Sequence, residues 1–161
     1  MNLKNLFELQ KQLNEEIDYN QELSDYVISR RKMLALHVEI GELANETRCF
    51  KYWSNKKPSP KKVILEEYVD ALHFILTLGL DRDYTDIDLN PKDSEYCLTD
   101  QFLNLYIDIN DMMITASKDH YITLFEDFLT LGMSLGFSDA EIEEAYLKKN
   151  KINHIRQANG Y

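Results

Sequence analysis

Apolar side chains recur along most of this chain at intervals of three and four residues, which is the period of an α-helix that buries one face. The pattern is clearest over residues 24–48, where Met33, Leu36, Ile40 and Leu43 follow a 3-4-3 spacing. Glycine and proline are scarce, with 5 and 3 residues respectively. The sequence therefore predicts an all-α protein, a helical bundle of about six helices.

The same period sets the limits of the predicted helices. They cover residues 5–20, 24–48, 61–80, 99–117, 120–135 and 138–157. The first is expected to bury Leu6, Leu9, Leu13 and Ile17, the fourth Phe102, Leu105, Ile109, Met112 and Ala116, and the fifth Tyr121, Leu124, Phe128, Leu131 and Leu135. Ser138 and Glu141 form a capping box that begins the last helix.

Two segments interrupt this pattern. Residues 54–62 contain two prolines, which lack the N–H that a helix needs, so they separate the second helix from the third. Residues 81–97 are acidic and without a sustained period, and we expect a surface loop there. Because a split at this loop would leave each half with a thin core, we expect one domain over residues 1–161.

The overall charge narrows the choice of partners. With 18 Lys+Arg and 28 Asp+Glu the formal net charge is −10. Polymeric nucleic acid is therefore an unfavourable partner, since binding it requires positive charge against the phosphates. No stretch approaches the roughly 18 apolar residues of a membrane-spanning helix, and charge follows the first residues too soon for a signal peptide. With two cysteines, too few for a disulfide framework, we expect a cytoplasmic protein with no membrane partner.

Two acidic motifs lie on consecutive predicted helices. Glu39 and Glu42 are three residues apart on the second helix, and Glu67 and Asp70 are three apart on the third. If these helices pack antiparallel, four carboxylates converge, and charges about 5 Å apart repel by about 3 kcal/mol per pair at an effective dielectric of 20. Such a cluster persists by protonation, by pairing with cations, or by binding a hard divalent ion such as Mg²⁺. The alternative is a pair of solvated helix faces.

Polar residues on the last helix suit a phosphate ligand. Tyr146, Lys149, Asn153 and Arg156 follow a 3-4-3 spacing, so they share one face. Positive charge on that face suits a polyphosphate that extends from a metal cluster. The alternative is that these cations complement the negative end of the helix.

Other side chains suit a nucleobase. Gln10 and Asn14, four residues apart, offer both hydrogen-bond donors and acceptors. Trp53 and Phe74 could stack on a base, and His73 follows Asp70 by about one helical turn. The alternatives are surface amides, core aromatic residues and a structural histidine.

Together these residues resemble the dimeric dUTPase family, within the all-α nucleoside triphosphate pyrophosphatase superfamily. The superfamily pattern is matched by EIGE at residues 39–42 and by EYVD at residues 67–70. The dUTPase branch is matched by LQKQLN at 9–14, FKYW at 50–53, DALHFILTLGL at 70–80 and AYLKKNKINHIRQANGY at 145–161.

The resemblance implies a dUTP diphosphatase that forms dUMP and pyrophosphate from dUTP, with dUDP as a further candidate substrate. It implies that two or more Mg²⁺ ions, with Mn²⁺ as a substitute, are held by the catalytic residues Glu39, Glu42, Glu67 and Asp70. Glu39 or a hydroxide on the metal would help to activate the attacking water. The implied substrate-binding residues are Gln10, Asn14 and His73 around the uracil, Trp53 or Phe74 at the base and sugar, Lys149, Asn153, Arg156 and Asn159 at the phosphates, and Tyr146 beside them. The family also implies a homodimer.

Two other functions stay open at this point. One is a pyrophosphatase with the same metal motif and another base specificity, for dCTP or for a broad range of nucleotides. The other is a helical regulatory binding module whose metal site is degenerate. The presence of all four motif carboxylates favours an enzyme, and an enzyme that also binds a regulatory protein is compatible with the same residues.

Overall fold

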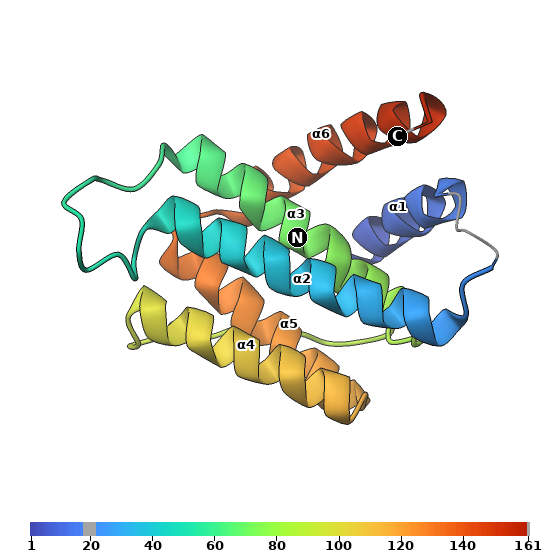
Figure 1. Cartoon of the computed structure of the whole chain (residues 1–161), viewed down its shortest axis with the longest axis horizontal. Coiled ribbons are helices and arrows are strands. Elements are labelled where there is room, and N and C mark those ends of the chain that lie inside the picture. Colours follow the sequence, from blue (N-terminus) through green and yellow to red (C-terminus); the bar gives the residue numbers. More distant parts are fainter. Residues whose placement is uncertain (18–21, 161) are drawn as a thin grey trace.

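Six helices account for most of the chain in the computed structural model, which describes residues 1–17 and 22–160. They are α1 (Leu3–Glu16), α2 (Asp25–Thr47), α3 (Lys61–Leu80), α4 (Leu98–Ile114), α5 (Lys118–Ser134) and α6 (Asp139–Ala158) (Figure 1). The described residues contain no strand, which confirms the all-α prediction. None of these six helices combines the length and the apolar character that crossing a membrane requires.

Helix α3 lies at the centre of the arrangement. It packs along α2 on one side and against α1 and α6 on another, and it also contacts α5, which pairs with α4 (Figure 1). α2 and α3 run antiparallel. Lys32, in the first part of α2, pairs with Asp81 just after α3 at 2.8 Å, and Ser59, just before α3, donates to Glu46 near the end of α2. The middle of α2 therefore faces the middle of α3, where both acidic motifs lie.

Two buried tyrosines fix α3 against α5. The Tyr68 hydroxyl on α3 donates to a backbone carbonyl of α5 at 3.1 Å, and the Tyr121 hydroxyl on α5 donates to a carbonyl of α3 at 3.0 Å. Each hydroxyl lies close to a glycine on the opposite helix. A Cβ at Gly79 would lie 2.2 Å from the Tyr121 hydroxyl, and one at Gly132 would lie 2.5 Å from the Tyr68 hydroxyl. This close packing holds α3 in a fixed position beneath its polar residues.

Serine caps define where three helices begin. Ser24, Ser117 and Ser138 each accept a hydrogen bond from a backbone N–H of the first turn. The predicted capping box of Ser138 and Glu141 is confirmed. Ser117, predicted as the last residue of the fourth helix, is instead the cap of α5, which therefore begins at Lys118.

The predicted inner faces are largely correct, and the exceptions lie at helix ends. Met33 and its partners on α2 are buried. Ile17 and Ala116 are not on an inner face, because α1 ends at Glu16 and α4 ends at Ile114, and the residue after each helix has extended backbone. The predicted first helix extends to residue 20, and residues 18–20 lie outside the described part of the chain.

The segment of residues 81–97 contains no helix, in agreement with the prediction of a loop. It is less fully on the surface than its composition indicates. Tyr84, Ile87 and Leu89 pack against the hydrophobic core, and the Tyr84 hydroxyl donates to Ala116 at 2.8 Å. Ile87 and Leu89 line a cavity with Leu129 and Met133 of α5, so the loop crosses that helix on its way to α4.

Candidate active site

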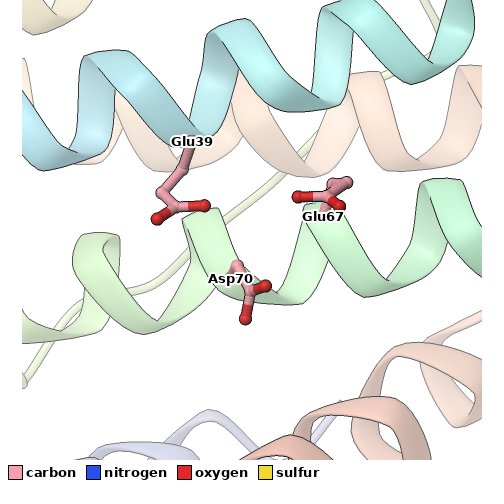
Figure 2. Close-up of side chains that lie close together, drawn as sticks. All are labelled: Glu39, Glu67 and Asp70. Atoms are coloured by element: carbon pink, nitrogen blue, oxygen red, sulfur yellow. The ribbon is translucent and has the colours of Figure 1, made fainter. Parts of the chain in front are cut away.

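Three carboxylates meet in the seam between α2 and α3. Glu39 extends from α2, while Glu67 and Asp70 share one face of α3 because they are three residues apart (Figure 2). One oxygen of each of the three lies within 4.8 Å of the others. In the described part of the chain, no other group of three or more His, Cys, Asp or Glu side chains is as close. The convergence predicted from the two motifs is therefore found for three of the four residues.

Burial and mutual repulsion make this cluster costly when all its members are charged. Burial first, and then the charges of Asp70, Glu42 and Glu67, raise the pKa of Glu39 to about 7. Burial, followed by the charge of Asp70, also raises the pKa of Glu67. The pKa of Asp70 is raised by burial even though a hydrogen bond from Lys149 opposes the shift. The cluster therefore binds protons, or other cations, close to neutral pH.

Glu42, the fourth motif carboxylate, lies at the edge of the cluster. Its side chain is exposed and it is not one of the three that converge. Its charge nevertheless raises the pKa values of Glu39, Glu67 and Asp70, so it lies close enough to act on all three.

The three converging side chains fit a hard divalent cation. Carboxylate oxygens are the ligands that Mg²⁺ and Mn²⁺ take in proteins. Each of the three side chains is half-buried, so the donors are held in place while one side stays open to water or a ligand. A bound cation would also offset the repulsion that raises the pKa of Glu39.

Helix α6 brings positive charge to this cluster. The Nζ of Lys149 lies 2.5 Å from Oδ2 of Asp70, and the two side chains are 21% and 20% exposed. Arg156 lies two turns further along α6, and its charge lowers the pKa of Asp70. Both cations line a groove of about 440 Å³ between α3 and α6, whose apolar wall includes Val69 and Ile152.

The other two predicted phosphate-binding residues lie further along α6. Asn153 is half-buried, one turn beyond Lys149. Asn159 ends the helix and is exposed. At 1.5 Å of rise per residue, it lies about 15 Å along the axis from Lys149, so the structure does not bring it to the carboxylates.

The three residues predicted around the uracil form a polar seam between α1, α3 and α6 together with Tyr146, which was predicted beside the phosphate-binding residues. The ring of His73 stacks on Tyr146 with centroids 4.3 Å apart. The Tyr146 hydroxyl donates to Oε1 of Gln10 at 2.8 Å, and Nε2 of Gln10 donates to Oδ1 of Asn14 at 2.9 Å. Gln10, His73 and Tyr146 are buried, and Asn14 is half-buried. Gln10, Asn14 and Tyr146 thus form one hydrogen-bonded group, and His73 joins it by ring stacking.

The buried ring of His73 presents a hydrogen-bond acceptor. Its Nδ1 lies 2.6 Å from the carbonyl of Val69, so that nitrogen carries the proton. Burial lowers the pKa of His73 to about 4, which keeps the ring neutral. Nε2 then has a lone pair, and within the described residues it has no hydrogen-bond partner.

Two further residues of the seam were not predicted. The Thr77 hydroxyl lies within hydrogen-bond distance of Gln10 and Asn14, and the buried Asn150 has an Nδ2 without a partner among the described residues. Thr77 follows His73 by four residues, so it lies on the same helical face. That spacing was the available signal for Thr77.

The two predicted aromatic residues lie in different surroundings. Phe74, on α3, is half-buried and packs against the core. Trp53 is 64% exposed in the loop between α2 and α3, and its ring contacts are edge-to-face with Phe50 and Tyr52. Phe74 lies one helical turn beyond Asp70 on α3, whereas Trp53 is exposed in a loop.

A known protein family matches the chain over both the carboxylate cluster and the polar seam. A family model described as dUTPase matches residues 2–161, which include all six helices. No curated protein matches the chain at a significant level.

Proposed function

The chain belongs to the dUTPase family and is a dUTP diphosphatase; we propose that it converts dUTP to dUMP and pyrophosphate with Mg²⁺ as cofactor. The observation that carries the proposal is the convergence of Glu39, Glu67 and Asp70 beside Lys149. Oxygen ligands next to a cation suit a substrate that brings both a metal and phosphates. Family membership also favours an enzyme over the regulatory binding module considered above.

We propose that Glu39, Glu67 and Asp70 hold the metal, with Glu42 contributing from the edge of the cluster. Two or more Mg²⁺ ions would fit four carboxylates, and Mn²⁺ prefers the same oxygen ligands. When bound, the metal polarises the phosphate oxygens and offsets the charge on the leaving pyrophosphate.

The reaction joins a water oxygen to a phosphorus of dUTP and breaks the bridging P–O bond between the α- and β-phosphates, so that dUMP and pyrophosphate separate and the water loses a proton. Glu39 is the proposed acceptor of that proton. This role follows from the position of Glu39 in the carboxylate cluster, facing Glu67 and Asp70 from the opposite helix.

Helix α6 is the proposed phosphate-binding element. Lys149 lies beside Asp70, and Asn153 and Arg156 follow it on the same face of the helix. Their donors would offset charge on the phosphates from the side opposite the carboxylates. Asn159 would extend this contact at the end of the helix.

The polar seam is the proposed uracil-binding region, with Gln10, Asn14, His73 and Tyr146 as its residues. The unpartnered Nε2 of His73 can accept the N3–H of uracil. Phe74 and Trp53 are proposed to shape the pocket around the base and sugar. Selectivity would follow because a base with the wrong donors leaves buried polar groups unpaired.

A substrate panel tests this function. Pyrophosphate release from dUTP, dCTP, dTTP and UTP would be measured with Mg²⁺ and after chelation, together with phosphate release from dUDP. We expect dUTP to have the highest kcat/KM and chelation to stop turnover. Equal turnover of the four triphosphates would instead support a broad pyrophosphatase, and turnover in the presence of excess chelator would contradict a metal-dependent mechanism.

We also propose that the protein forms a homodimer. Leu34 and Val38 on α2, and Leu103, Ile107 and Ile114 on α4, are each at least 49% exposed. Large apolar side chains exposed on neighbouring helices are typical of an interface between subunits. Sedimentation at micromolar concentration should give twice the mass of the chain, and a monomer at that concentration would contradict the proposal.

A cytoplasmic location is part of the same proposal. Cys49 and Cys97 are both free, as is usual in a reducing compartment. Fractionation of cells that make the tagged protein should recover it with soluble cytoplasmic markers.

A further inference from the structure

The polar seam contains a closed set of hydrogen bonds that includes one hydroxyl with no role in the function proposed above. Nε2 of Gln10 donates to the Thr77 hydroxyl at 3.1 Å and to Oδ1 of Asn14 at 2.9 Å. The Thr77 hydroxyl donates in turn to Oδ1 of Asn14 at 3.2 Å. At the other end, the Tyr146 hydroxyl donates to Oε1 of Gln10. Each of these side chains comes from α1, α3 or α6.

These bonds set the direction of both amides. Tyr146 supplies a proton to Oε1 of Gln10, so the amide nitrogen of Gln10 faces Thr77 and Asn14. Two donors then hold Oδ1 of Asn14 inside the seam. The Asn14 group left to meet a ligand is its Nδ2, which is a donor only.

The direction of the Asn14 amide matters because Asn14 lies at the wall of a cavity. Its side chain is half-buried and also lines a cavity of about 860 Å³ between the end of α1, the start of α2 and the end of α3. That volume is within the range of small-molecule sites. The Thr77 hydroxyl already accepts from Gln10 and donates to Asn14, so it acts on a ligand there through Asn14.

We propose that Thr77 is a positioning residue for base selection, which holds Asn14 with its amide nitrogen toward the base. This inference rests on the proposed function, because it assumes that a uracil edge meets Asn14. Uracil presents a carbonyl acceptor where cytosine presents an amine donor. An outward Asn14 Nδ2 therefore pairs with uracil and opposes cytosine. If the side-chain amide of Asn14 were rotated by 180°, its oxygen would accept a hydrogen bond from the cytosine amine instead.

The test compares Thr77→Val with Thr77→Ser. Valine keeps the shape and removes the hydroxyl, whereas serine keeps the hydroxyl. We expect Thr77→Val to reduce the preference for dUTP over dCTP, as the ratio of kcat/KM values, by about tenfold, and mainly through KM for dUTP. Thr77→Ser should retain the preference within about twofold. Thr47→Val is the matched control, because Thr47 is equally buried on α2 and its hydroxyl donates within its own helix.

A second measurement does not depend on turnover. In the metal-free protein, the side-chain NH₂ resonances of Gln10 and Asn14 should shift or broaden in Thr77→Val and should be unchanged in Thr47→Val. The proposal is overturned if Thr77→Val keeps the wild-type preference, if it slows both substrates equally, or if those NH₂ resonances do not move. A wild-type enzyme that does not prefer dUTP would contradict the proposed function instead, and the amide resonances would still report on the positioning role.

Discussion

The α2–α3 pair and the α4–α5 pair both place carboxylates across a helix seam. In the first, Glu39 faces Glu67 and Asp70. In the second, Asp108 on α4 faces Asp127 on α5. Burial and the neighbouring carboxylates raise the pKa to about 7 for Glu39 and also for Asp108, where Asp127 is the main neighbour. Judged by their acidic residues alone, the two pairs are alike.

They differ in what balances the negative charge. On the first pair, α6 brings Lys149 to within 2.5 Å of Asp70. On the second, His120 only weakly opposes the rise in the pKa of Asp108, and the hydrogen bond between Asp108 and Asp127 requires a shared proton. We therefore expect that two facing acidic helices do not suffice for a cation site. A third helix, with a cation and an open side, would decide whether a metal and phosphates can replace the proton.

The largest expected difference between the two pairs is in activity. Glu39→Gln and Asp70→Asn each remove a charged oxygen from the proposed metal site. Mutation of residues that hydrogen-bond to a metal ligand typically lowers metal affinity or activity by about 10- to 100-fold. We therefore expect loss of a ligand itself to lower kcat/KM for dUTP by more than about 100-fold. Asp108→Asn is the matched control and should stay within about twofold of wild type. An equal loss in all three variants would contradict the assignment of the active site to α2–α3.

The next largest effect on activity is expected at Lys149, the cation that lies beside the α2–α3 pair. We expect Lys149→Met to lower kcat/KM by about 10- to 100-fold, because Lys149 contacts the ligand Asp70 and faces the proposed phosphates. Lys148→Met changes the exposed neighbour and should have little effect. If both variants behave alike, the contribution is the general charge of α6 and not the position of Lys149.

Metal binding should stabilise the protein through the α2–α3 pair and not through the α4–α5 pair. At a Mg²⁺ concentration ten times its Kd, binding adds about 1.4 kcal/mol to the free energy of unfolding, which raises Tm by about 3–6 °C for a chain of this size. We expect this shift in wild type and in Asp108→Asn, its loss in Glu39→Gln, and its reversal by chelation. A full shift in Glu39→Gln would place the bound ion elsewhere.

The smallest effect is the pH dependence of stability that the second pair contributes. The pKa of Asp108 is about 7 in the folded protein and near its ordinary, lower value when unfolded. Between those values the folded state binds a proton that the unfolded state does not, so stability falls as pH rises from about 4 to about 7. Asp108→Asn removes this contribution to the pH dependence of stability. Over pH 5–8 in chelator, its Tm should fall less than that of wild type, by an amount that solvent screening of the half-exposed Asp108 keeps small. Identical slopes would show that Asp108 carries no such proton.

Much of the fold was predictable because it depends on local spacing. Glu67 and Asp70 had to share a face of α3 once that segment became helical, and the prolines between α2 and α3 indicated where the chain turns. The helix ends were harder, because they depend on single residues. Ser117 had helical neighbours on both sides, and only its backbone conformation makes it the cap of α5.

Parts of the candidate site depend on contacts between distant segments, and spacing does not report these. Thr77 reaches Gln10 across 67 residues of sequence, and its spacing from His73 predicts the helical face on which it lies but not this partner. For Trp53 the local sequence gave a signal that the position of the side chain does not match. Its neighbours in sequence match the family, yet its side chain is exposed in a loop.

The amino-acid sequence by itself determined the helical class, the order of the helices and the faces that carry the acidic motifs, because helical periodicity and capping act over a few residues. Tertiary structure decided which acidic pair receives a cation, which amides are joined by Thr77, and how deeply the ring of His73 is buried. Those features depend on the burial and the relative placement of α1, α3 and α6. Desolvation and hydrogen bonding act over a few ångströms in space, whatever the separation along the chain.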